Sequence, residues 1–156
     1  MMEESKVTEM HRYFAVELNN TCWDFIDRSG QLSDEEGHRL VDRAHASLFH
    51  WSQVGEVINL ARGHYLVSRA YSAAKNPVEA LAHATLCLNI CKKHEFGDFD
   101  LAFAYEAMAR AQQLGKNFEC QKLFMGLAKR AGDEIKGEED KKIFFDSLKE
   151  VPGYEA

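Results

Sequence analysis

The sequence predicts an all-α fold built from antiparallel helical hairpins, and three observations support that prediction. Apolar residues recur at three- and four-residue steps along most of the 156 residues, which is the period of amphipathic helices. Almost no segment alternates as a strand does, and the chain holds only two prolines. One pattern of two helices and a tight turn also occurs twice between residues 54 and 131. We therefore expect about seven helices in one domain that spans residues 1–156.

Turn and capping signals place these helices along the chain. The expected hairpins span about residues 7–51, 56–94 and 100–131, and a C-terminal capping helix spans about residues 138–149. Ser33 and Glu36 have the spacing of a capping box, in which two side chains satisfy free N–H groups at a helix start. Asn76-Pro77 supplies a capping side chain followed by proline at the first helical position. Residues 97–100 are expected to end the fourth helix and cap the fifth.

Apolar stripes on the first and last helices define part of the expected core. On the first helix the stripe includes Tyr13, Phe14 and Cys22, which follow one another at helical spacing. On the last helix Ile143 and Phe144 stand against a charged face. All five side chains are expected to point inward.

The repeated hairpin can be aligned residue by residue. Residues 68–76 align with residues 109–117, so that an Arg-Ala pair and a Lys-Asn pair coincide. The offset is about 41 residues before the turn and about 40 after it. A period of this length is typical of stacked helical hairpins.

The first copy of this hairpin resembles a tetratricopeptide repeat. Val67, Ser68 and Tyr71 stand where that family has Leu, Gly and Tyr, and Ala80 stands at the small residue of its second helix. The repeats here are about six residues longer than the usual 34 and lack the closing proline. The resemblance implies a short right-handed superhelix and a protein-interaction scaffold. Residues 45–100 are also similar to uncharacterised bacterial proteins of this type.

Composition excludes several classes of function. The net charge of −6 argues against nonspecific nucleic-acid binding, which needs a basic surface. No apolar run approaches the roughly 20 residues that span a bilayer, and the N-terminus lacks the apolar core of a signal peptide. The four cysteines show no CxxC spacing, so we expect reduced, mostly buried thiols in a cytoplasmic protein.

Motifs for catalysis are missing from the sequence. It contains no phosphate-binding GxGxxG or P-loop, no GxSxG nucleophile elbow and no HExxH zinc motif. We therefore expect a protein that is not an enzyme, with no catalytic residue and no cofactor.

Seven histidines make metal binding an alternative to be weighed. His83, Cys87, Cys91 and His94 follow one another at four- and three-residue steps on one helix. At about 1.5 Å per residue, His83 and Cys91 lie roughly 12 Å apart along the axis. One zinc ion needs ligands about 2.0–2.3 Å away, so this column cannot hold it alone. An adjacent pair could do so only with partners from another helix, and a small-ligand or metal-binding protein stays the alternative hypothesis.

A second histidine pattern lies on the second helix. His38, Asp42 and His45 share a helix face, and an Asp can orient a His for general-base catalysis. No nucleophile accompanies them, so a solvated helix face is the expected structure.

The most informative feature is a row of residues on the third helix that recurs on the fifth. The row is Arg62, Tyr65, Arg69 and Ser72, and its counterparts are Phe103, Glu106, Arg110 and Gln113. First helices of successive hairpins line the concave face of such a stack, so both rows should face one groove. Arginine forks bind carboxylates and aromatic rings anchor interfaces. We predict that the groove binds an acidic segment or a carboxylate terminus of an unidentified protein or peptide.

Two alternatives to this groove stay open. Arg110 can pair with Glu106 one helical turn away, a surface contact of about 0.3–0.5 kcal/mol, which would leave the rows as ordinary solvated residues. The chain can also form a homodimer, because a stack of three hairpins leaves apolar ends that a second copy could cover.

Overall fold

Helices make up 81% of the computed structural model, which describes residue 1 and residues 3–156 and contains no strand among them. In chain order they are α1 (Glu4–Ile26), the short 3₁₀ helix η1 (Ser29–Gln31), α2 (Asp34–Val54), α3 (Val57–Ala73), α4 (Pro77–Lys93), α5 (Asp98–Leu114), α6 (Phe118–Asp133) and α7 (Glu138–Lys149). The all-α prediction, with its seven α-helices, is confirmed for this part of the chain. That the stack is a right-handed superhelix stays a prediction.

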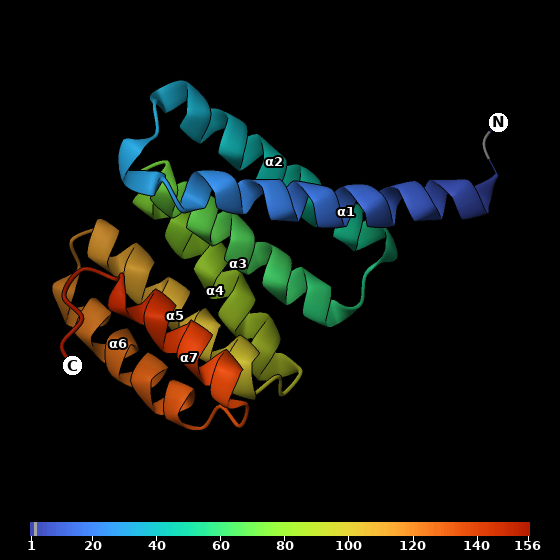
Figure 1. Cartoon of the computed structure of the whole chain (residues 1–156). Coiled ribbons are helices and arrows are strands. Elements are labelled where there is room, and N and C mark those ends of the chain that lie inside the picture. Colours follow the sequence, from blue (N-terminus) through green and yellow to red (C-terminus); the bar gives the residue numbers. More distant parts are fainter. Residues whose placement is uncertain (2) are drawn as a thin grey trace.

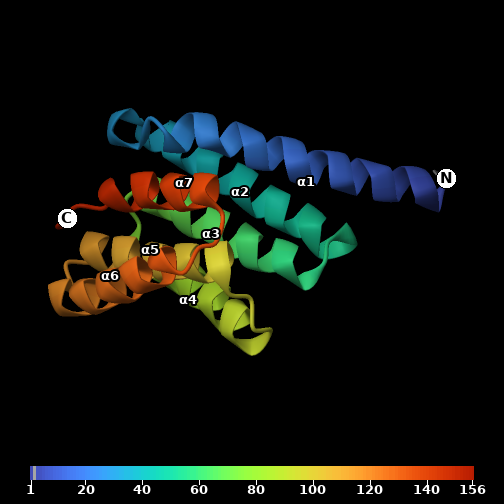
Figure 2. The same cartoon turned by 60° about the horizontal axis from the view of Figure 1, so that its bottom comes forward.

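Consecutive helices pair as three hairpins, which lie side by side along the molecule (Figure 1). The most extensive helix–helix contacts are those within α1–α2, α3–α4 and α5–α6. The hairpins join through α2 against α3 and α4 against α5, and α3 also packs on α5. Helix α7 packs on α5 and α6 and lies between that hairpin and α1 (Figure 2). Both ends of the chain therefore border the face formed by α3 and α5.

Two of the expected helix starts are confirmed. The backbone N–H of Glu36 donates to Ser33 Oγ at 3.2 Å, and the N–H of Ser33 donates to Glu36 Oε2 at 2.9 Å, which completes the capping box of α2. The Asn76 side chain accepts from the N–H of Glu79, and Pro77 opens α4. These starts depend on residues close in sequence, so they form without help from the rest of the fold.

The start of α5 differs from the expectation. The helix begins at Asp98, about three residues early, and Gly97 before it provides no side-chain cap. Asp98 itself has a φ of +53°, so the chain turns sharply at the first residue of the helix. Asp98 and Asp100 then lie in the first turn, where the positive end of the helix dipole favours carboxylates.

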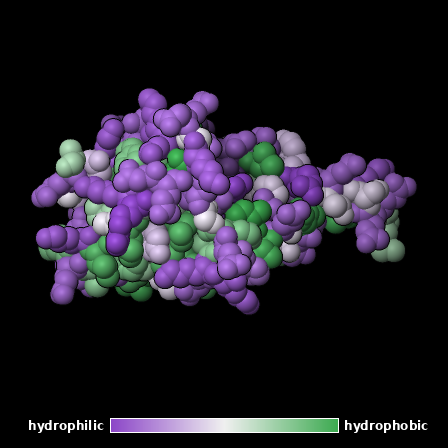
Figure 3. All heavy atoms as spheres, turned by 90° about the horizontal axis from the view of Figure 1, so that it is seen from below, coloured by the Kyte–Doolittle hydropathy of each residue, from purple (hydrophilic) through white to green (hydrophobic). Residues whose placement is uncertain are grey.

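The expected core is only partly correct on α1 and α7. Cys22 is fully buried, but Tyr13 is 60% exposed and Phe14 38% exposed, and the ring of Phe14 contacts only the margin of α2 at His50. The N-terminal end of α1 projects beyond the other helices (Figures 1 and 3). On α7, Phe144 is fully buried whereas Ile143 is 49% exposed. A helical stripe identifies which residues share a face, but not how far the neighbouring helices cover it.

A glycine lets α7 pack closely against α6. A Cβ on Gly132, which lies inside α6, would stand 2.3 Å from Phe144 Cε1 and 2.9 Å from Phe145 Cζ. Phe144 belongs to a core cluster with residues of α5 and α6. The missing side chain at position 132 therefore makes room for the ring that fixes α7.

The surface seen from below carries mostly hydrophilic side chains with separate hydrophobic patches between them (Figure 3). Within residue 1 and residues 3–156, no helix has both the length and the apolar content needed to cross a bilayer.

Candidate binding site

A cavity of about 580 Å³ lies where α1, α3, the start of α5 and α7 face one another. Aromatic rings line much of it: Trp23 comes from α1, Tyr65 from α3, and Phe99 and Phe103 from α5. The rings of Phe99 and Phe103 are 4.6 Å apart at their centroids, and those of Tyr65 and Phe103 are 5.3 Å apart. The cavity thus combines an aromatic lining with helices from both halves of the chain.

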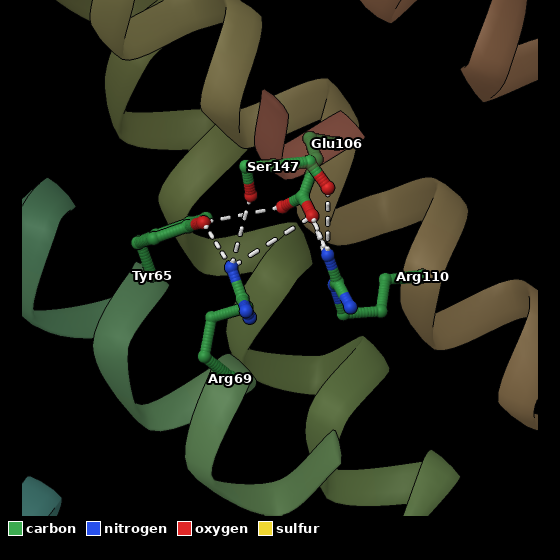
Figure 4. A network of polar contacts seen from close by, with 5 residues as sticks. All are labelled: Tyr65, Arg69, Glu106, Arg110 and Ser147. Atoms are coloured by element: carbon green, nitrogen blue, oxygen red, sulfur yellow. Dashed lines mark hydrogen bonds and ion pairs between the residues drawn. The ribbon is translucent and has the colours of Figure 1, made fainter. Parts of the chain in front are cut away.

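A buried carboxylate lies at the centre of a polar network beside this cavity (Figure 4). Glu106 is fully buried, and its Oε1 accepts a hydrogen bond from Arg110 Nε at 2.8 Å. Its Oε2 accepts from the Tyr65 hydroxyl at 3.2 Å, and that hydroxyl accepts from Arg69 Nη1 at 2.8 Å. Arg69 Nη1 is also 3.8 Å from Glu106 Oε1. Two guanidinium groups and a phenol therefore share one carboxylate.

Helix α7 completes the network through Ser147. The Ser147 hydroxyl accepts from Arg69 Nη1 at 3.4 Å, and its backbone carbonyl accepts from Arg110 Nη2 at 3.2 Å. Arg69 also lies over the Trp23 ring, with its guanidinium carbon 5.4 Å from the ring centroid. Side chains from α1, α3, α5 and α7 thus meet around one pair of arginines.

The side chains of the network together carry a net positive charge, because two arginines share one glutamate. Burial raises the pKa of the Tyr65 phenol, so the hydroxyl stays protonated and can donate to Glu106. One carboxylate then faces the guanidinium groups of Arg69 and Arg110, of which Arg69 is only 7% exposed. Within the network one positive charge is in excess, and the carboxylate of Glu150, which lines the cavity with Arg69, acts on that guanidinium from outside the network.

Arg62 forms a second ion pair at the cavity wall. Its Nε donates to Asp100 Oδ1 at 2.8 Å and its Nη2 to Asp100 Oδ2 at 3.1 Å, a bidentate arrangement. The Arg62 side chain is 59% exposed, so water screens the pair. Hydrogen bonding to Asp100 raises the pKa of Arg62, and the guanidinium stays charged.

Further carboxylates line the cavity near the C-terminal ends of α1 and α7. Asp146 is paired with Lys142 and Lys149. Asp27 and Glu150 line the same cavity and form no ion pair with any other described residue. With Asp100 these are four carboxylates against the two guanidinium groups of Arg62 and Arg69, so the charged side chains of the lining are negative in sum.

The structure brings the two predicted rows together. A smaller cavity of about 210 Å³ shares Arg69 and Glu150 with the larger one. The larger cavity is lined by Arg62, Tyr65, Arg69 and Phe103, and the smaller by Arg69, Ser72, Arg110 and Gln113. Glu106 of the second row is fully buried, and it is hydrogen-bonded to Tyr65, its counterpart one repeat away.

The alternative of solvated rows is wrong for their central members. Arg110 does pair with Glu106 one turn away, but the carboxylate is fully buried and the Arg110 side chain only 15% exposed, so this is not a surface contact. The hydroxyl of Ser72 is buried without a hydrogen-bond partner in the described residues. Packing of α1 and α7 over the rows removes most of them from water.

Sequence reasoning missed Trp23 and Ser147 as parts of this site. Neither residue belongs to the repeated hairpin, so the 41-residue offset gives no sign of them. They reach the site because α1 and α7 flank the two repeats. Cys87 and Cys91 of α4 also line the cavity, as free buried thiols.

Neither of the two expected histidine patterns is found as a group in the structure, because His83 and His45 contact residues of α3 instead. His83 does not join the cysteines of α4; its Nδ1 is 3.0 Å from Nδ1 of His64 on α3. His45 is not solvated as expected, since its Nε2 is 3.0 Å from the Tyr71 hydroxyl. His94 is exposed beside Phe96. Among the described residues no three His, Cys, Asp or Glu side chains stand together as a ready metal site.

Comparison with known proteins gives no relative for this chain. No family model, no curated protein and no solved structure matches it. The likeness to tetratricopeptide repeats stays a prediction from the residues of α3 and α4.

Proposed function

We propose that this chain is a non-catalytic binding protein of tetratricopeptide-like architecture, which holds a carboxylate-bearing end of a partner protein or peptide in the larger cavity. The observation that carries the proposal is an aromatic cavity with two arginines in its wall. Its volume of about 580 Å³ lies within the roughly 300–1,000 Å³ of ligand pockets. Apolar walls with a few polar groups are the usual composition of such pockets.

Unused hydrogen-bond donors support a carboxylate as part of the ligand. Arg62 binds Asp100 through Nε and Nη2, and Arg69 makes its contacts through Nη1. Within the described part of the chain, Nη1 of Arg62 and both Nε and Nη2 of Arg69 have no acceptor. A carboxylate can accept from such groups without breaking an existing ion pair.

The other charges of the cavity lining favour a ligand with a single carboxylate over a peptide segment with several acidic residues. Asp27 and Glu150 stand at the C-terminal ends of α1 and α7, where the helix dipoles are also negative. A segment with several acidic residues would meet these like charges. A chain terminus with an apolar last side chain instead places one charge near the arginines and its apolar part among the aromatic rings.

Pooled synthetic peptides test this proposal directly. The probes are hexapeptides that end in Phe or Leu, prepared once with a free C-terminal carboxylate and once as the amide. We expect the carboxylate form to bind and the amide form to bind about 10–100-fold more weakly, as for the loss of a hydrogen bond to a charged group. Isothermal titration calorimetry measures both affinities.

Two variants show where the peptides bind. Arg62→Ala should weaken the carboxylate form about tenfold, since that change removes one donor from the cavity wall. Arg39→Ala is the matched control, because Arg39 is exposed on α2 and outside the cavity. The same affinity for acid and amide, or for wild type and Arg62→Ala, would reject the proposed site, as would the absence of any binding.

A small carboxylic acid is the second candidate ligand. It is favoured by the position of α1 and α7, which face each other across the cavity and limit the room for an extended peptide. Phenylacetate and indole-3-acetate are suitable probes in the same titration. Binding of these acids without binding of the peptides would assign the cavity to a small ligand, again with Arg62→Ala as the test of location.

A further inference from the structure

The smaller cavity, of about 210 Å³, brings together polar side chains that the proposed ligand of the larger cavity does not use as a group. Two arginines from neighbouring helices line it, Arg69 of α3 and Arg110 of α5. Ser72 and Gln113, each three residues further along its helix, line it as well. An arginine and a polar side chain therefore stand on each of two walls.

The repeated hairpin is the reason that these side chains meet. Arg110 corresponds to Arg69, and Gln113 to Ser72, through the same 41-residue offset. Helix α3 packs on α5, so residues at matching positions of the two repeats become neighbours in space. Both guanidinium groups reach Glu106, one from α3 and the other from α5 (Figure 4).

Both arginines keep donors that have no acceptor in the described residues. Arg110 uses Nε and Nη2 for Glu106 and the Ser147 carbonyl, which leaves Nη1. Arg69 makes its contacts through Nη1, which leaves Nε and Nη2. The hydroxyl of Ser72 also has no partner, so its rotation into the cavity breaks no hydrogen bond. A ligand with several acceptor oxygens can bind here without taking a donor from the carboxylate of the network.

The charges around this cavity favour an anion. Two guanidinium groups line it against one carboxylate, that of Glu150. Glu150 acts on Arg69 but is exposed, so water screens its charge, whereas Arg69 is only 7% exposed. Glu106 neutralises one of the two guanidinium groups and leaves the other in excess. The larger cavity differs, because the charged side chains of its lining are negative in sum.

The size of the cavity and the directions of its donors restrict the kind of anion. Its volume of about 210 Å³ is roughly seven times the 30 Å³ that one water molecule occupies in the liquid, which suits a small polyatomic ion. A carboxylate offers two oxygens in one plane, whereas a phosphate group offers three acceptor oxygens around one centre. Donors that come from two helices match the second geometry better.

We infer that the smaller cavity is a binding site for a small tetrahedral oxyanion of the phosphate or sulfate class, held by the free guanidinium nitrogens of Arg69 and Arg110. Ser72 and Gln113 complete the site. The guanidinium groups supply charge-assisted hydrogen bonds, and the hydroxyl and the amide supply neutral ones. The site does not depend on the ligand proposed for the larger cavity, although Arg69 lines both cavities.

Titration of the full-length protein with sodium sulfate, at an ionic strength held constant with sodium chloride, tests the site. The side-chain N–H signals of Arg110 and Gln113 report on its occupation in nuclear magnetic resonance spectra. We expect both signals to shift along one saturable curve. The affinity should fall about tenfold in Gln113→Ala and in Ser72→Ala, as for the loss of a hydrogen bond to a charged group.

Glu150→Gln should have the opposite effect on sulfate binding. The substitution removes a like charge from the lining and keeps the shape of the side chain. The affinity for sulfate should rise about fivefold, as for a pair of charges that water screens. A purely structural role of Glu150 would not tighten the binding of an anion.

Gln112→Ala is the matched control for Gln113→Ala. Gln112 is the neighbouring half-buried glutamine of α5, and it lines neither cavity, so its loss should leave the sulfate affinity unchanged. No saturable shift in the wild type, the same affinity in wild type and Gln113→Ala, or equal losses in the two glutamine variants would each overturn the inference. If Gln113→Ala does not fold, as judged by circular dichroism, Ser72→Ala takes its place in these comparisons.

A second pair of probes distinguishes a free anion from the phosphate group of a larger molecule. Inorganic phosphate and phenyl phosphate carry the same oxyanion, and both are titrated as sulfate is. Tighter binding of phenyl phosphate would assign the site to a phosphorylated molecule, and tighter binding of inorganic phosphate would assign it to the free ion. Binding of neither, in the wild type, would contradict a phosphate site.

Discussion

At the scale of single residues, the most important side chain is Glu106, the buried counter-ion of two arginines. Its carboxylate has no exposure to water and is shared by Arg69, Arg110 and the Tyr65 hydroxyl. Removing one partner from such a group leaves the others charged and buried, which costs more than the pair contributes when intact. The Glu106 site is therefore where a single substitution should have the largest effect.

Glu106→Ala should lower the free energy of unfolding by about 3–5 kcal/mol, because two guanidinium groups lose their common counter-ion. Urea denaturation of wild type and variant measures the difference. Glu35→Ala is the control, since Glu35 pairs with Arg39 on the surface with side-chain exposures of 74% and 65%, and it should cost at most about 1 kcal/mol. Equal effects of the two substitutions would show that Glu106 is not a buried counter-ion.

Protonation of His83 should make the free energy of unfolding depend on pH. Its pKa in the folded state is about 4, against an ordinary value of 6.5, through burial first and then His64 and His45. The unfolded chain therefore binds a proton between these two values while the folded chain does not, so stability falls as the pH falls from about 6.5 to about 4. Urea unfolding across this range should show a shallower decline in the free energy of unfolding for His83→Phe than for wild type. An identical decline in the two proteins would contradict the attribution of this pH dependence to His83.

At the scale of elements, local signals predict helix starts well and packing poorly. The capping box at Ser33 and the Asn76 cap are confirmed because each needs only residues three positions apart. The exposure of Tyr13 and the burial of Arg69 could not be predicted, because each depends on where distant helices lie. Helix α7 covers Arg69, whereas α2 contacts His11 and leaves Tyr13 on an open side of α1.

Gly132→Ala should loosen α7, since the new methyl group would stand 2.3 Å from the Phe144 ring. Overpacking of this kind costs about 1–3 kcal/mol. Gly126→Ala on the same helix is the matched control: nothing lies within 4 Å of its added Cβ, and the change should stabilise α6 by up to about 1 kcal/mol. Hydrogen exchange should become faster in α7 for Gly132→Ala only. Unchanged exchange there would mean that Phe144 does not fix the helix.

At the scale of the whole molecule, the two ends of the chain add walls to the face of a repeated hairpin pair and so form a cavity that is open to solvent. The sequence repeat identifies which residues of α3 and α5 face the same side, as the Tyr65–Glu106 hydrogen bond shows. It contains no information about α1 and α7, which contribute Trp23 and Ser147 from outside the repeat. The chemistry of the two rows could therefore be predicted, but the additional walls from α1 and α7 could not.

The most direct test of the proposed function is a nuclear magnetic resonance titration with the free-carboxylate peptides. The side-chain N–H signals of Trp23 and Arg62, which line the cavity from α1 and α3, report on its occupation. We predict that both signals shift in proportion to the bound fraction, and that the indole N–H of Trp51, which is outside the cavity, does not. Shifts confined to residues away from α1, α3, α5 and α7 would contradict the account.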